Sequence, residues 1–103
     1  MNDHRRVERQ VAAMHRVIAE RLRSGDPLPL ERARANLARW RESFGGQLPF
    51  AYVEWVDLID QGRERVIDVL ESGDQDSIRR RASSPFTGVL TAQERWRIIH
   101  DAA

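Results

Sequence analysis

Residues 7–27, VERQVAAMHRVIAERLRSGDP, define the first structural element of this chain. Its large apolar side chains recur at spacings of four, three, four and four, at Val7, Val11, Met14, Ile18 and Leu22. Residues three or four apart share one face of an α-helix, so the pattern predicts a helix with a single apolar stripe. The segment Ser24-Gly25-Asp26-Pro27 ends it, because glycine suits a left-handed C-terminal cap and proline cannot continue the hydrogen-bond ladder.

Two further helices are predicted, each opened by a proline and followed by glycine. Pro29 is a favoured first-turn residue, and Gly45-Gly46 stops the helix that it opens. The apolar stripe of that helix is predicted at Leu30, Ala33, Leu37, Trp40 and Phe44. Pro49 opens the next helix, PFAYVEWVDLIDQG, whose buried stripe is predicted at Tyr52, Trp55, Val56 and Ile59.

The remainder of the chain also predicts short helices. Gly62 and Gly73 bound GRERVIDVLESGD, which places Val66, Ile67 and Leu70 inward. Asp74 or Asp76 can cap the next turns, and Thr91 with Glu94 fits a capping box for a last helix in which Trp96 and Ile99 share a face. No run alternates apolar and polar residues as a strand does. The predicted fold is therefore all-α, an irregular bundle of five or six short helices with a longer N-terminal helix.

A chain of 103 residues, 41% hydrophobic and 32% charged, has the length and composition of one globular domain, residues 1–103. The stripe of the N-terminal helix, residues 1–24, approaches heptad spacing, which makes it a candidate dimerisation or partner arm. Cysteine is absent, so no disulfide or thiolate metal site can form. The first ten residues, MNDHRRVERQ, contain no apolar secretion segment, and no apolar run reaches the roughly 20 residues that span a bilayer. The expected location is the cytoplasm, without a membrane partner.

The residues that could support chemistry do not form a known constellation. His4 and His15 lie eleven residues apart, about 16 Å along a helix, so one chain cannot bring them to one metal. Glu54, Asp57 and Asp60 share a helix face, which is typical of a solvated acidic surface, since nothing around them suggests a desolvating pocket. No phosphate loop or nucleophile motif is present. We therefore expect neither an enzyme nor a metal or cofactor site.

The stretch 79-RRRASSPFTGVLTAQERWRII-99 places three arginines beside a short apolar loop. One interpretation makes the loop a lid over the domain's own core. The other makes it an interface, with aromatic anchors ringed by arginines. The partner-binding residues predicted in that case are Arg81, Phe86, Val89, Leu90, Arg95 and Trp96.

Charge is distributed in blocks although the net charge is +1. Residues 1–44 carry ten Arg and six acids, residues 45–76 two Arg and eight acids, and residues 77–103 five Arg and two acids. Arginine clusters are typical of phosphate contacts, which makes Arg5, Arg6, Arg9, Arg79 and Arg80 candidate nucleic-acid contacts. The acidic middle block and the low net charge count against DNA binding.

The pattern RxxSPFxGVLTxxERW at residues 81–96, together with ANLARW at residues 35–40, resembles segments of small bacterial helical proteins. These proteins are associated with toxin–antitoxin-like gene pairs. The likeness extends over residues 30–100 and implies a protein partner, a toxin or enzyme encoded nearby that the chain inhibits. It implies no catalytic residue. The alternatives are a DNA-binding regulator that uses the arginine-rich helices, and a small non-enzymatic adaptor subunit.

Overall fold

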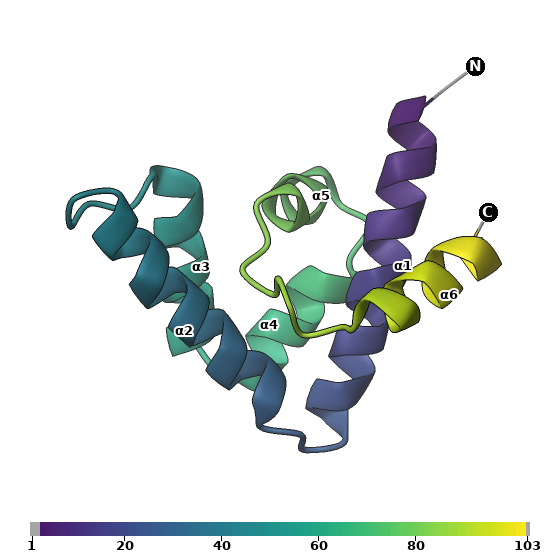
Figure 1. Ribbon diagram of the computed structural model, residues 1–103, viewed down its shortest axis with the longest axis horizontal. Helices are drawn as coiled ribbons and strands as arrows, with labels where there is room; N and C mark the ends of the chain where they lie inside the picture. The colour runs from purple at the N-terminus through teal and green to yellow at the C-terminus, as the bar shows by residue number, and fades with distance from the viewer. Residues whose placement is uncertain (1–2, 103) are drawn as a thin grey trace.

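The computed structural model describes residues 3–102, in which it has six helices and no strand. The helices are α1 (Asp3–Arg23), α2 (Leu28–Ser43), α3 (Phe50–Asp60), α4 (Arg63–Glu71), α5 (Gln75–Ala82) and α6 (Ala92–Ala102) (Figure 1). The predicted all-α fold and its longer N-terminal helix are confirmed. No helix within the described residues is both long enough and apolar enough to span a membrane.

The helix α1 is the centre of the packing, because α2, α4, α5 and α6 all contact it. Its C-terminal half buries Ile18, Ala19 and Leu22 in the core. Its N-terminal half extends beyond the other helices (Figure 1), and every residue from 3 to 9 is exposed. The apolar stripe predicted from Val7 onward is therefore uncovered at its beginning, where Val7 is 51% exposed.

The core is centred on Trp55, whose side chain is completely buried. Its indole Nε1 donates a hydrogen bond to the carbonyl oxygen of Arg80 at 2.8 Å, and its ring meets the Phe86 ring edge-on at 5.7 Å between centroids. Buried apolar side chains from α1, α2, α3, α4 and the loop after α5 surround it. They are Ile18, Ala19, Leu22, Ala33, Leu37, Leu58, Ile59, Val66, Ile67, Val69, Leu70, Phe86 and Leu90.

The helix ends follow the predicted capping residues. Gly25 adopts a φ of +87° after α1, and the N–H of Asp26 bonds back to the carbonyl of Arg21 at 3.0 Å, as in a glycine C-terminal cap. Asp74 caps α5 by accepting from the Ser77 N–H at 2.7 Å. Thr91 and Glu94 exchange reciprocal bonds of 2.9 and 3.0 Å at the start of α6. These contacts confirm the Gly25 stop, the Asp74 cap and the capping box.

Two aromatic residues lie outside the stripes predicted for them. Phe44 is 54% exposed and is the C-cap residue of α2, which ends at Ser43. Trp96 is 66% exposed and stacks on His100, one turn later on α6, with ring centroids 5.0 Å apart. No residue of α6 from Ala92 to Asp101 is buried, so α6 lies on the surface of α1 rather than in the core.

Candidate functional site

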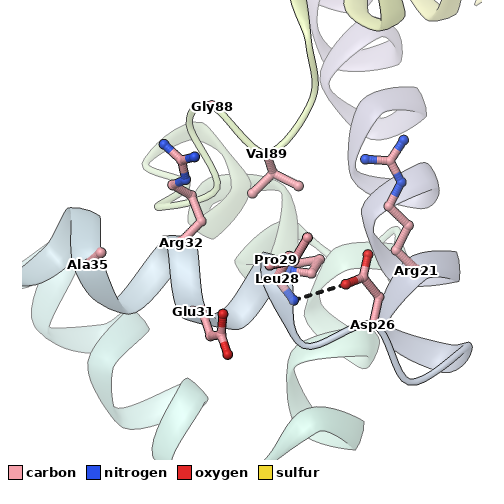
Figure 2. A pocket seen from close by; sticks show the side chains of 9 residues that line it. All are labelled: Arg21, Asp26, Leu28, Pro29, Glu31, Arg32, Ala35, Gly88 and Val89. Atoms are coloured by element: carbon pink, nitrogen blue, oxygen red, sulfur yellow. Dashed lines mark hydrogen bonds between the residues drawn. The ribbon is translucent and has the colours of Figure 1, made fainter.

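Residues 83–91 form the loop between α5 and α6, which crosses between α1 and α2 (Figure 1). Two hollows border this loop, and Gly88 lines both of them. One has a volume of about 350 Å³ and lies between the loop, the end of α1 and the start of α2 (Figure 2). The other, of about 180 Å³, lies between the loop, the middle of α1 and the start of α6.

The loop is a lid over the domain's own core. Phe86 and Leu90 are only 4% and 6% exposed and belong to the central apolar cluster. Phe86 contacts both Trp55 and His15 edge-on. In this conformation, neither side chain is accessible to a partner, so the burial supports the lid rather than the interface.

A buried asparagine anchors the same loop to α2. Asn36 is 1% exposed, and its Nδ2 donates to the carbonyl oxygens of Pro85 at 2.9 Å and Thr87 at 2.8 Å. Its Oδ1 accepts from Arg39 Nη2 at 2.7 Å. Every polar atom of the amide is thereby used, and the loop backbone is fixed to the helix.

Arg81, predicted as a partner contact, completes the C-terminal end of α4. Its Nη1 donates to the carbonyl oxygens of Val69 at 2.9 Å and Ser72 at 2.6 Å. The last carbonyls of a helix lack intrahelical partners, and a buried guanidinium can satisfy two of them at once. Arg81 is 7% exposed, and burial lowers the pKa of its guanidinium. It therefore has a structural role.

The six predicted partner-binding residues do not form one exposed patch. Arg81, Phe86 and Leu90 are buried, and Val89 is half-buried at the edge of the Figure 2 hollow. Only Arg95 and Trp96, both on α6, are exposed. The accessible part of the predicted surface is therefore the outer face of α6.

The candidate nucleic-acid contacts separate into two groups. Arg79 binds both carboxylate oxygens of Glu54, at 2.7 and 3.1 Å, and Arg80 Nε reaches the same carboxylate at 3.3 Å. Hydrogen bonding to Arg79, more than any other contact, lowers the pKa of Glu54 to about 2. These two arginines therefore join α5 to α3. Arg5, Arg6 and Arg9 lie on the exposed, projecting half of α1.

The larger hollow has balanced charge. Arg21, Asp26, Glu31 and Arg32 line it together with Leu28, Pro29 and Val89, and Figure 2 shows Arg21 and Arg32 on either side of Val89. Arg21 is paired with Glu94, and Asp26 accepts from the N–H of Leu28 at 3.0 Å. Two cations and two acids leave no net charge to select an ion.

The smaller hollow contains a pair of residues that the sequence analysis did not connect. His15 is 6% exposed, and its Nε2 lies 2.8 Å from Ser84 Oγ. Its Nδ1 lies 2.7 Å from the carbonyl oxygen of Val11, one turn earlier on α1. The two side chains are 69 residues apart in sequence, so no local motif could have revealed them.

An apolar surface on α3 was also missed. Eight of the eleven residues of α3, FAYVEWVDLID, are apolar or aromatic, too many for one face of a helix. Trp55, Leu58 and Ile59 are buried. Phe50 is 75% exposed and Val53 38% exposed, and with half-buried Val56 they form a second stripe at a spacing of three.

Val56 of this stripe lines a groove between α2 and α3 with a volume of about 180 Å³, whose lining residues do not include Phe50 or Val53. Its apolar lining is Leu37, Ala38, Leu48, Val56 and Ile59, and Arg34 and Arg41 stand at its α2 side. We call Phe50, Val53, Val56, Leu48 and Leu37 the α3 surface. The excess of apolar residues over one stripe was the sequence feature that could have indicated it.

Comparison with known proteins supplies no relative. No protein-family model, curated protein or solved structure matched the chain. The functional interpretation therefore depends on the chain's own surfaces and contacts.

The described residues, 3–102, include no group of three His, Cys, Asp or Glu side chains placed to hold a metal ion. The features that remain for function are the α3 surface, the exposed face of α6 and the His15–Ser84 pair.

Proposed function

We propose that the chain is a protein-binding module that holds its partner on the α3 surface. The observation that supports this most directly is the exposure of Phe50 and Val53, at 75% and 38%, on a helix whose other apolar face is already buried. Contiguous exposed apolar side chains on a small domain mark interaction sites more often than isolated ones do. Phe50 provides an aromatic anchor of the kind enriched at the centres of interfaces.

The occupant that fits this surface is an amphipathic helix of another protein. A bound helix lays apolar side chains at positions i, i+3, i+4 and i+7 into a groove, and the groove between α2 and α3 offers Leu37, Leu48 and Val56 to receive them. The matching helix would be apolar on the face that meets the groove.

The charges beside the groove specify one flank of that helix. Arg34 reaches Asp60 through a single 3.3 Å contact in which both side chains are more than half exposed, and such pairs contribute little. Within residues 3–102, Arg41 forms a hydrogen bond only through its Nε, to the Gly46 carbonyl oxygen. Both guanidinium groups can therefore take carboxylates, so the partner helix would carry acidic residues along the side that faces α2.

In the antitoxin-like form of this proposal, the partner is a toxin or enzyme encoded nearby, and the chain inhibits it by covering such a helix. In the adaptor form, the same surface joins the chain to a larger assembly. The DNA-binding alternative has less support from the contacts, because Arg79 and Arg80 are held by Glu54.

The test compares matched variants in one capture experiment. The tagged wild-type chain, the double variant Phe50→Asp/Val53→Asp and the single variant Trp96→Ala are incubated with nuclease-treated lysate of the host at moderate salt. We expect one stoichiometric protein to be retained by the wild type and by Trp96→Ala, and to be lost by the double variant. Because all three positions are exposed, circular dichroism and thermal melting should stay nearly unchanged.

The captured protein is then made recombinantly, and its binding is measured by calorimetry at 50 and 200 mM salt. A largely apolar interface changes little over this range, whereas contacts to several phosphates weaken steeply. If Trp96→Ala loses the captured protein and the Phe50→Asp/Val53→Asp variant retains it, the interface lies on α6 and not on the α3 surface. Capture of nucleic acid alone, removed by nuclease, would contradict the proposal and favour the regulator.

A further inference from the structure

We infer that Ser84 is an activated nucleophile with His15 as its general base, and that the adjoining hollow admits the short apolar acyl group of an ester. This goes beyond protein binding and involves a different part of the molecule, since the α3 surface lies on α2, α3 and the loop between them and His15 lies on α1. Failure of one proposal therefore leaves the other unaffected.

The hydrogen-bond pattern determines which ring nitrogen of His15 can take a proton. A backbone carbonyl only accepts, so the 2.7 Å contact to Val11 requires a proton on Nδ1. In the neutral ring, Nε2 then has its lone pair free and can only accept, so Ser84 donates its hydroxyl proton across 2.8 Å. A nucleophile bound to a base that a third group orients is the arrangement by which serine nucleophiles are activated. Here the Val11 carbonyl replaces the usual carboxylate.

Burial favours the neutral ring that this role needs. His15 is 6% exposed, and desolvation lowers the pKa of its imidazole below 6.5, an effect to which the positive charge of Arg81 adds and which the hydrogen bond to Val11 opposes. Arg95 of α6 lines the same hollow. The ring is therefore mostly neutral at pH 7 and available as a base.

The hollow beside the pair has the lining of an acyl site. Met14, Ile18, Phe86 and Leu90 form its apolar walls, while Ser84 opens onto it and is itself only half-buried. Its volume of about 180 Å³ is below the roughly 300 Å³ at which pockets for drug-sized ligands begin, which limits the acyl group to a short chain. Arg95, at the same hollow, supplies N–H donors for the carbonyl oxygen as negative charge develops on it.

The reaction balances with an ester and water alone. Ser84 Oγ attacks the ester carbonyl carbon as its proton passes to His15 Nε2. The carbon–oxygen bond to the alcohol then breaks, and the alcohol leaves with that proton, giving acyl-Ser84. Water, deprotonated by His15, hydrolyses the acyl group and restores the hydroxyl.

The test uses a fluorophosphonate, which forms an Oγ–phosphorus bond with an activated serine and releases fluoride. The wild-type chain, Ser84→Ala, His15→Gln and the control Ser83→Ala are incubated with the probe, and adducts are followed by intact mass and located by peptide mapping. Ser83 is the matched control, because its hydroxyl is adjacent in sequence and forms no hydrogen bond with the described residues. Turnover of p-nitrophenyl butyrate is measured in parallel.

We expect one adduct, on Ser84, in the wild type and in Ser83→Ala, and none in Ser84→Ala. In His15→Gln, the labelling rate should fall about 100-fold or more, as loss of a general base predicts. Should His15→Gln fail to fold by circular dichroism, the wild-type pH profile takes its place, and labelling should decline with a midpoint below pH 6.5. Absence of an adduct on Ser84, an unchanged rate in a folded His15→Gln, or a rate independent of pH between 5 and 8 would each overturn the inference.

Discussion

Asn36 Nδ2 lies 2.9 Å from the carbonyl oxygen of Pro85, 49 residues later in the chain. This contact, with the matching one to Thr87 at 2.8 Å, holds the loop over the core by its backbone. A loop has few internal hydrogen bonds of its own, so its buried carbonyls must find partners elsewhere. Asn36 meets that requirement, which explains why a polar residue occupies a completely buried position on α2.

Replacing Asn36 by leucine should lower the free energy of unfolding by about 2–4 kcal/mol, because two loop carbonyls lose their donors and each unsatisfied group costs about 1–3 kcal/mol. Urea denaturation would measure the loss. Arg39→Ala is the matched control, since it removes only the contact to Asn36 Oδ1. Equal effects from both substitutions would show that the loop is not fixed through the Asn36 amide.

Arg81→Met should destabilise the domain by about 2–3 kcal/mol, because the carbonyls of Val69 and Ser72 lose the guanidinium that they share. Arg97→Ala on exposed α6 should stay within about 0.5 kcal/mol. Thermal melting of both variants gives the comparison. If Arg81→Met had wild-type stability but captured the partner less well, Arg81 would be a partner contact and not a structural residue.

Phe86→Ala should cost about 3–5 kcal/mol as a core truncation, whereas Trp96→Ala should cost less than about 1 kcal/mol because its ring is 66% exposed. Chemical denaturation gives the free energy of unfolding of both variants and thereby distinguishes a loop that covers the core from a loop that forms an exposed interface. If Phe86→Ala changed the free energy of unfolding only slightly and abolished partner binding, the interpretation of the loop as a lid would be contradicted.

Acid stability should depend on Glu54. Its pKa is lowered from 4.5 to about 2, chiefly by the hydrogen bond from Arg79, so its contribution to stability is complete above about pH 4.5 and is lost as the pH falls toward 2. Glu54→Gln should therefore have a lower melting temperature than the wild type at pH 6. Between pH 4.5 and 2, its melting temperature should change less with pH than that of the wild type. Asp57→Asn, on the exposed side of the same helix, is the control. Parallel pH profiles for Glu54→Gln and the wild type would refute this assignment.

The sequence predicted the helices because their ends are determined locally. Gly25 after α1, the Asp74 cap and the pair Thr91 and Glu94 each act within one turn of the helix that they terminate. Local backbone preference therefore decides them, whatever the rest of the fold does.

The candidate sites were less predictable, because they depend on which segments meet in space. His15 and Ser84 come from α1 and a loop 69 residues away, and Arg81 reaches the end of a different helix. On α3, spacing alone could not decide which apolar residues are buried, since Phe50, Val53 and Val56 also lie at helical spacing. Trp96 belongs to a residue type that is usually well covered, but it lies on a helix in which no side chain from Ala92 to Asp101 is buried.

The shallow attachment of α6 has a consequence for how the molecule opens. The ion pair from Glu94 to Arg21 and the half-buried Ile98 and Ile99 are the main contacts that attach α6 to the rest of the domain. Local unfolding takes place first where little apolar area is lost. The amide protons of α6 should therefore exchange with solvent through separate detachment of that helix, whereas those of α4 should exchange only on global unfolding. We expect the domain to unfold as two cooperative units of unequal stability.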